Sequence, residues 1–276
     1  MILVSICCIT FNHQDYIEDT IKGVLNQKAN FNYELIIGED CSSDGTLKII
    51  EKYQTLYPDK IKLIANKNNL GAIKNELNVL KNCKGKYIAI CEGDDFWTDE
   101  NKLQKQVDFL NQHPEYSCCF HNAFIYNETK NTYNKYTEIE TEKDFYLTDL
   151  LKSNFIPSAS IVFKNIFTEK DFSKMLMLKS TDWYMNILMA EKGKVRYLNE
   201  VMSSYRSHKG GMWSSLTYEK AIAFRINNIM DLNKAFDYKY DNEFRVSIIE
   251  LALQLKSLVG INDIKKYIIK KLLRKQ

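Results

Sequence analysis

The chain has 276 residues, of which 45% are hydrophobic, and its formal net charge is +3 at pH 7. This is enough apolar sequence for one large domain, or for one domain with an appendage. The small net charge does not indicate a nucleic-acid-binding protein, and no stretch approaches the roughly 18–20 apolar residues of a membrane span. Because residues 1–10 lack the basic start of a secretory signal, we expect a cytoplasmic protein, or a peripheral one on the inner face of the cell membrane.

The first half of the chain alternates between apolar strands and amphipathic helices. Residues 2–10 are almost continuously apolar and rich in β-branched side chains, which is typical of a central strand covered on both faces. The predicted strands are residues 2–10, 33–38, 61–65 and 87–91, and the predicted helices are residues 15–26, 46–57, 72–82 and 101–111. Repeated β-α alternation predicts an α/β fold with a doubly wound, mostly parallel, Rossmann-like sheet.

The second half is more mixed. We expect strands at residues 116–126, 158–163 and 195–205, a loop or hairpin at 127–143, a loop at 206–213, and helices at 182–190, 218–236 and 242–258. The seven cysteines are odd in number and contain no CxxC pair, which argues against a disulfide framework and against a zinc site. We expect them to be small buried apolar residues in a reducing compartment.

Acidic side chains cluster where two of the predicted strands end. Asp40 follows the second strand, and Glu92, Asp94 and Asp95 follow the fourth. Carboxylates bunched at the end of a buried strand repel one another and lose water, which costs free energy unless a cation or ligand compensates. Ligands of open α/β sheets bind beyond the carboxyl ends of the strands, and Mg²⁺ or Mn²⁺ choose carboxylate oxygens while leaving positions for phosphates. The pattern predicts a metal–diphosphate site; the alternative is a solvated acidic turn with Asp95 near a helix start.

Four short motifs occur in a recognisable order: TFN at residues 10–12, EDCSSDGT at 39–46, NLG at 69–71 and EGDD at 92–95. With them the sequence resembles the inverting glycosyltransferases of family 2, of the bacterial surface-polysaccharide type. The resemblance covers roughly the first 210 residues and implies a GT-A fold. It also implies the following division of the chain: a glycosyltransferase domain over residues 1–213, made of a nucleotide-binding half (1–113) and an acceptor half (114–213), and a C-terminal helical extension over 214–276.

The resemblance assigns donor-binding roles to residues after three strands: Thr10, Asn12, Asp40, Glu92, Asp94 and Asp95. Asp40 would read the base, for example the N–H of a uracil ring, while Asp94 and Asp95 would hold a divalent metal, Mn²⁺ or Mg²⁺, and the ribose. Glu92 stands where the family usually has Asp. In a strand, residues 92 and 94 share a face and 95 points away, so all three converge only if the strand breaks at Gly93, which glycine permits.

The resemblance also implies a catalytic base in the second half. Asp182, at the start of a predicted helix, matches the family's Asp, although the acid that usually precedes it is here Thr181. The alternative is that Asp182 only caps the helix. His208 falls where related enzymes place a residue that closes over the diphosphate or metal; its alternative is an ordinary loop histidine.

The implied reaction is inverting, metal-dependent transfer of one hexosyl or N-acetylhexosaminyl group. The donor would be a nucleotide-sugar, a UDP-sugar first of all, and the acceptor a glycan or lipid-linked glycan. Two alternatives stay open: a non-catalytic sugar-nucleotide-binding subunit, suggested by Thr181, and a sugar nucleotidyltransferase, although TFNHQDY replaces the Gly-rich basic loop of those enzymes. Dinucleotide-binding and P-loop motifs are absent from the sequence.

The end of the chain is a basic amphipathic segment. Over residues 261–276, apolar Ile264, Ile268 and Leu272 recur at helical spacing among six Lys and Arg residues. This pattern is typical of a helix that docks on an anionic membrane surface. The alternative is a solvated helix that completes the fold.

Overall fold

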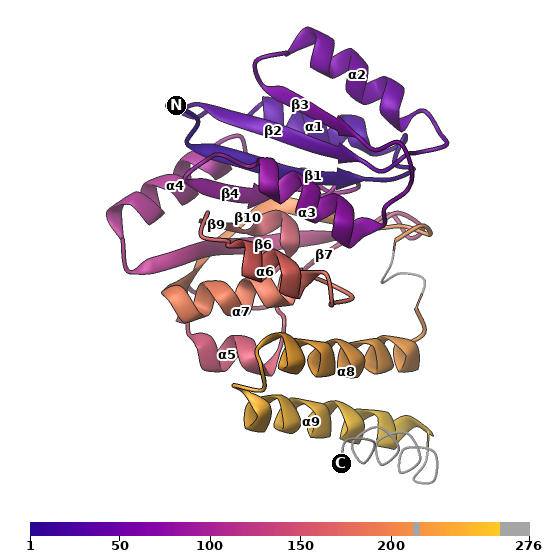
Figure 1. The fold of residues 1–276 in the computed structure, drawn as a ribbon, viewed down its shortest axis with the longest axis vertical. Helices are drawn as coiled ribbons and strands as arrows, with labels where there is room; N and C mark the ends of the chain where they lie inside the picture. Colours follow the sequence, from indigo (N-terminus) through magenta and orange to yellow (C-terminus); the bar gives the residue numbers. More distant parts are fainter. Residues whose placement is uncertain (212–215, 260–276) are drawn as a thin grey trace.

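The computed structural model of the chain describes residues 1–211 and 216–259, with side chains described up to residue 254. A ten-stranded sheet runs through these residues (Figure 1). Its strands are β1 (Val4–Thr10), β2 (Tyr33–Glu39), β3 (Ile61–Ala65), β4 (Tyr87–Ile90), β5 (Phe96–Trp97), β6 (Tyr116–Asn127), β7 (Thr132–Lys135), β8 (Lys143–Phe145), β9 (Val162–Lys164) and β10 (Lys194–Ser207). The main path is β3-β2-β1-β4-β9-β6-β10-β5, with β7 paired to β6 and β8 to β10.

The N-terminal part of the sheet is parallel, as the β-α alternation predicts. β3, β2, β1 and β4 are parallel neighbours, and so are β6 and β10, whereas β9 is antiparallel to both β4 and β6. The mostly parallel α/β sheet is therefore confirmed. Because β1, β2 and β4 are parallel, their carboxyl ends lie at the same edge of the sheet.

Helices cover both faces of this sheet. They are α1 (Ile17–Leu25), α2 (Thr46–Leu56), α3 (Ala72–Asn82), α4 (Lys102–Gln112), α5 (Leu147–Lys152), α6 (Glu169–Met175), α7 (Asp182–Lys192), α8 (Tyr218–Ala235) and α9 (Asp241–Val259). Side chains of β1 alternate between two apolar cores: Ile6 and Cys8 pack with the α1, α2 and α4 side, and Cys7 packs with the α3 and α7 side.

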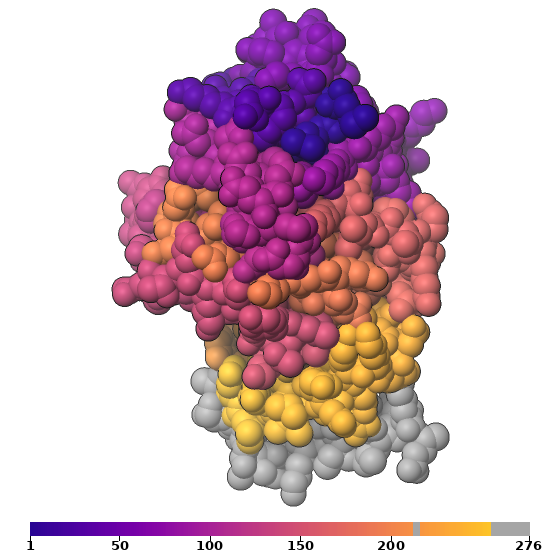
Figure 2. All heavy atoms as spheres, turned by 90° about the vertical axis from the view of Figure 1, so that its left-hand side faces the viewer, coloured from indigo at the N-terminus to yellow at the C-terminus, as the bar shows by residue number. Residues whose placement is uncertain are grey.

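α8 and α9 enlarge the second of these cores. Their buried residues Ile226, Ile229 and Ile248 belong to the same apolar cluster as Met185 of α7. The two helices form the end of the molecule opposite β3 and α2 (Figures 1 and 2). Residues on both sides of the predicted boundary contribute to this one core. The division into residues 1–213 and 214–276 therefore stays a prediction.

The structure differs from the predicted elements in two places. Residues 158–163 are not one strand: a 3₁₀ turn (Ser158–Ser160) precedes β9, because Pro157 starts a turn closed by the Ser160 N–H on its carbonyl. The loop expected from residue 206 begins later, because Arg206 and Ser207 still pair with β6. The hairpin allowed at 127–143 is confirmed by β7. The short elements β5, β8, α5 and α6 carry too little periodicity to be read from sequence.

The cysteines all lie in the described part of the chain, and none forms a disulfide; six are buried, as expected, but Cys41 is exposed. Among the described residues, no helix has both the length and the apolar character needed to cross a bilayer. The basic helix expected at 261–276 lies outside the described residues.

Candidate functional site

The segment after β4 runs alongside the end of β1 and brings the acidic motif to the carboxyl edge of the sheet. The backbone N–H of Gly93 donates to the carbonyl of Ile9 at 2.9 Å, and the N–H of Asp95 donates back to the carbonyl of Glu92 at 3.0 Å, which closes a turn. A Cβ on Gly93 would lie 2.5 Å from Thr10 Oγ1. Glycine is therefore required here for close packing against β1.

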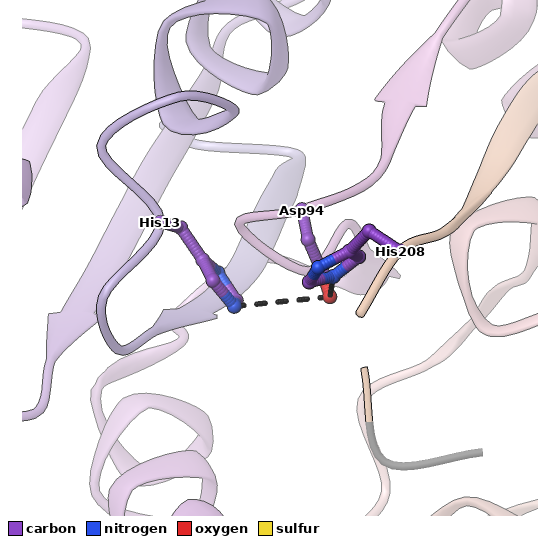
Figure 3. Close-up of side chains that lie close together, drawn as sticks. All are labelled: His13, Asp94 and His208. Carbon is purple, nitrogen blue, oxygen red and sulfur yellow. Dashed lines mark hydrogen bonds and ion pairs between the residues drawn. The ribbon is translucent and has the colours of Figure 1, made fainter. Parts of the chain in front are cut away.

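Asp94 lies between two histidines from other segments (Figure 3). Its Oδ2 is 3.1 Å from Nε2 of His208, which follows β10, and 3.8 Å from Nε2 of His13, which follows β1. One ligand atom from each of the three residues lies within 4.8 Å of the others. The sequence analysis named Asp94 and His208 but missed His13, whose only signal was its place in the loop directly after the first strand.

The charges in this cluster favour an ionised carboxylate and a neutral imidazole. Burial would raise the pKa of Asp94, but the hydrogen bond from His208 and the neighbouring His13 lower it below its usual value. Burial lowers the pKa of His13, against the opposing charge of Asp94. His13 Nδ1 is buried and has no hydrogen-bond partner among the described residues. Deprotonated carboxylate and imidazole groups at this separation are suitable ligands for a divalent cation.

Asp95 faces a different part of the molecule. It is buried, and its Oδ1 accepts the backbone N–H of Arg206 in β10 at 2.9 Å, while its Oδ2 has no partner among the described residues. Burial and the charges of Asp94 and Glu92 raise its pKa well above the usual value. Asp95 therefore lies outside the cluster around Asp94, because the side chains of these two adjacent residues point in opposite directions.

Two of the other predicted donor-binding residues, Asn12 and Thr10, lie at or just beyond the end of β1. Asn12, at φ 55°, accepts the backbone N–H of Ser43 through Oδ1 at 2.9 Å, and so links the loops that follow β1 and β2. Thr10, at the end of β1, is buried, and its hydroxyl has no partner among the described residues. Both lie at the carboxyl edge, as predicted.

Asp40 is buried directly after β2 and holds the loop that precedes α3. It accepts the backbone N–H groups of Leu70 at 2.8 Å and Gly71 at 2.9 Å and the side-chain amide of Asn66 at 3.0 Å. Gly71 has φ 83°, a conformation that favours glycine. An ionised carboxylate has about four acceptor positions, so these bonds leave one for a ligand donor.

A second acidic group lies between β4, α3 and α7. A cavity of about 130 Å³ is lined by Glu92, by Glu76 of α3 and by Asp182 at the first position of α7. Burial raises the pKa of Glu92 to about 8, and the charges of Asp94, Glu76 and Asp182 add to this. Burial also raises the pKa of Glu76 to about 7; a hydrogen bond from Thr181 opposes the rise, and the charge of Asp182 adds to it.

Hydrogen bonds orient Asp182 in this cavity. Its carboxylate accepts from the hydroxyl of Ser180 and from the side-chain amide of Asn154. The hydroxyl of Thr181 donates to Glu76. The carboxylate of Glu76 in α3 therefore lies beside Thr181, the residue that stands where the family usually has an acid. The sequence did not predict this contact, because the two residues are more than a hundred positions apart.

The chain is similar to several known proteins. The model of glycosyl transferase family 2 matches residues 5–170. An uncharacterised protein of Mycobacterium tuberculosis is 35% identical over 212 residues, which are 77% of this chain and 61% of that protein. The Escherichia coli UDP-Glc:α-D-GlcNAc-diphosphoundecaprenol β-1,3-glucosyltransferase WfaP is 30% identical over 227 residues, 77% of this chain and 80% of its own length. The chain thus spans about three-fifths of the length of the mycobacterial relative.

The fold also has a counterpart among solved structures. Residues 1–349 of S. aureus TarS in complex with UDP-GlcNAc match with a TM-score of 0.65 at 17% identity, over 93% of this chain and 73% of that chain. This likeness confirms the predicted GT-A fold class.

Proposed function

We propose a reaction from one premise: the chain belongs to glycosyltransferase family 2, because the family model spans more than half of it. The proposed reaction is transfer of a single sugar from a nucleotide-sugar, a UDP-sugar first of all, to a glycan or lipid-linked glycan acceptor, with inversion at the anomeric carbon. Its proposed place is the biosynthesis of a bacterial surface polysaccharide. The name of WfaP describes a reaction of this kind, and TarS binds UDP-GlcNAc.

One observation carries the proposal. Glu92 lies two residues before Asp94 of the cluster with His13 and His208, and it lines one cavity with Asp182; the charges of Asp94 and Asp182 both raise its pKa. A diphosphate bound at the cluster would direct the sugar toward Asp182. This gives the donor and the acceptor hydroxyl a common meeting point at the carboxyl edge of the sheet.

The residues of the cluster fit a divalent cation. We propose that Asp94, His208 and His13 hold the ion. Asp95 would stabilise the turn through its hydrogen bond to the backbone of Arg206. Two imidazole nitrogens beside one carboxylate favour Mn²⁺ over Mg²⁺, because Mg²⁺ prefers oxygen ligands. When bound, the ion would supply positive charge to the departing diphosphate.

In this proposal Asp182 is the catalytic base. It accepts the proton of the attacking acceptor hydroxyl, a role that typically contributes about 10²–10⁴-fold to rate. Its bonds to Ser180 and Asn154 hold the carboxylate in the cavity. Direct displacement assisted by one base inverts the anomeric carbon.

The donor base and sugar would be held by the remaining predicted residues. Asp40 keeps one acceptor position for the N–H of a uracil ring, in addition to its bonds to the loop before α3. The unpartnered hydroxyl of Thr10 and the loop built by Asn12 lie at the same edge. Glu92, with its raised pKa, can donate a hydrogen bond to the donor at neutral pH.

The test is a panel of UDP-, GDP- and TDP-sugars incubated with Mn²⁺, with and without a lipid-linked acceptor. Acceptor-dependent release of the nucleoside diphosphate supports the proposal. Thermal stabilisation by a sugar nucleotide without any release would instead identify a non-catalytic binding subunit. Formation of pyrophosphate from a sugar phosphate and a nucleoside triphosphate would identify a nucleotidyltransferase.

We also propose that residues 261–276 dock the protein on anionic lipid, each basic residue near the surface contributing about 1 kcal/mol. The support is the sequence pattern alone. Replacing Lys265, Lys266 and Lys270 by Gln in the full chain should weaken co-sedimentation with phosphatidylglycerol vesicles. Unchanged sedimentation would contradict the idea.

A further inference from the structure

A second cavity adjoins the catalytic one and opens toward the C-terminal helices. Its volume is about 250 Å³, and it shares Ser180 and Asp182 with the cavity that contains Glu92. The rest of its lining comes from Trp183 of α7, from the end of α5 and the two residues after it, from α8 and α9, and from Tyr136 beyond β7. α8 and α9 lie outside the part of the chain that the family model matches.

The side-chain carbonyl oxygen of one buried amide in this cavity lacks a hydrogen-bond partner among the described residues. Asn228 of α8 lines the cavity, is 5% exposed, and has an Oδ1 without a hydrogen bond among the described residues. A buried carbonyl oxygen of this kind costs free energy until a donor reaches it. A sugar hydroxyl in the cavity would supply that donor.

An aromatic ring forms another part of the lining. Tyr136 directly follows β7 and is 37% exposed; β7 and Tyr136 together are called the β7 arm here. The backbone N–H of Tyr136 donates to the carbonyl of Ala123 in β6 at 2.8 Å, which holds the end of this arm against β6. Burial raises the pKa of Tyr136, the charge of Asp182 adds to the rise and that of Arg225 opposes it. Tyr136, Asp182 and Arg225 line the same cavity, and the ring offers an apolar surface to a ligand bound there.

The charges of the described lining cancel. Lys152 and Arg225 are cationic, and Asp182 and Glu250 are anionic. A cavity with an aromatic face, amides and balanced charge suits a neutral polyhydroxylated ligand. A carboxylate on the ligand would lose its hydration there without an excess of positive charge to compensate. The volume of the cavity is near the lower end of the roughly 300–1,000 Å³ of small-ligand pockets, so it accommodates one terminal sugar and not a long chain.

We propose that this cavity binds the acceptor sugar that presents its hydroxyl to Asp182, and that it selects neutral sugars over uronic acids. The inference rests on the proposed function. α8 and α9 are then the elements that determine acceptor specificity, while the carboxyl edge of the sheet binds the donor.

The test measures glycoside binding to the full chain without any donor. Saturation-transfer difference NMR is recorded with methyl glucoside, methyl N-acetylglucosaminide and methyl glucuronide. At least one neutral glycoside should bind, and the glucuronide should bind more weakly by roughly tenfold. Tyr136→Ala and Asn228→Leu should each weaken the neutral glycoside to a similar extent. Asn228→Leu removes the unpartnered Oδ1 and keeps a side chain of similar size, and circular dichroism of the variant checks that it folds.

The matched control is Tyr133→Ala, since Tyr133 lies on the same arm, is exposed, and does not line the cavity. It should bind the glycosides as the parent does. The inference is overturned if none of the three glycosides binds the parent, if the glucuronide binds as well as the others, or if both cavity variants bind like the parent. Failure of the proposed reaction would look different: glycoside binding would persist, and UDP-sugars with Mn²⁺ would give no release of UDP.

Discussion

Asp94 and Glu92 are two residues apart, yet their surroundings act on them in opposite directions. Asp94 lies between His13 and His208, which lower its pKa despite burial. Glu92 lines a cavity with Glu76 and Asp182, and burial together with the charges of Asp94, Glu76 and Asp182 raises its pKa to about 8. The same chemical group is therefore favoured as an anion at Asp94 and as a neutral acid at Glu92, because neighbouring charges and burial together determine the protonation state.

The largest effect is expected from Asp182→Asn, which removes the proposed base. Acceptor-dependent release of UDP should fall about 10²–10⁴-fold, while thermal stabilisation by UDP-sugar and Mn²⁺ persists. Initial rates on parent and variant measure this. Asp108→Asn, an exposed change on α4, is the control and should retain the parent rate. A variant at Asp182 that keeps the parent rate would show that the base lies elsewhere.

The next effect separates the two aspartates of the acidic motif. Asp94→Asn removes the carboxylate of the three-residue cluster. It should weaken Mn²⁺ binding by at least about 100-fold, because losing even an outer-shell partner of a ligand costs about 10–100-fold. Calorimetric titration with Mn²⁺ measures this. His13→Ala should also weaken binding, whereas His113→Ala, at a half-exposed histidine outside the cluster, should not.

Asp95→Asn provides the sharper comparison. Because Asp95 bonds to the backbone of Arg206, its replacement should leave Mn²⁺ affinity within a few-fold of the parent. If Asp94→Asn and Asp95→Asn lost Mn²⁺ affinity equally, both aspartates would be metal ligands, as the sequence predicts. Circular dichroism of each variant separates loss of metal from loss of fold.

Glu76→Gln should change the pH dependence of stability. The pKa of Glu76 is about 7 in the folded protein, above its value of 4.5 in an unfolded chain, so the folded state binds the proton more tightly. The free energy of unfolding should therefore decrease in the parent as pH rises from about 4.5 to 7, by on the order of 2 kcal/mol. The variant should lose this part of the decrease. Urea unfolding at pH 5 and 7.5 tests it, with exposed Glu51→Gln as the control; an equal slope in Glu76→Gln would contradict the assignment.

The smallest effect is expected from Thr181→Val, which removes the hydrogen bond to Glu76. Losing a bond that opposes the rise of the Glu76 pKa should raise that pKa further and lower stability near pH 7.5 by about 1 kcal/mol. The same urea series detects it. Identical curves for Thr181→Val and the parent would mean that this contact does not stabilise the ionised form of Glu76.

Local patterns were sufficient for much of the fold. Alternation of apolar strands and helices predicts β1 to β4 with their helices, because buried parallel strands and amphipathic helices have different periods. The antiparallel β9 was read as a longer strand, since nothing local shows that Pro157 begins a turn. β5, β8, α5 and α6 depend on pairing with distant segments, which no short window of sequence records.

The sequence by itself determined that carboxylates at the carboxyl ends of β2 and β4 would gather at one edge with the polar residues after β1, because parallel strands place those ends together. It also placed Asp182 at a helix start. Only the tertiary structure decided that His13 joins Asp94 and His208, that Asp95 turns to β10, and that Glu76 comes to Thr181. These contacts join segments far apart in the chain, and the direction of each side chain is set by packing on the two faces of the sheet rather than by the residues next to it.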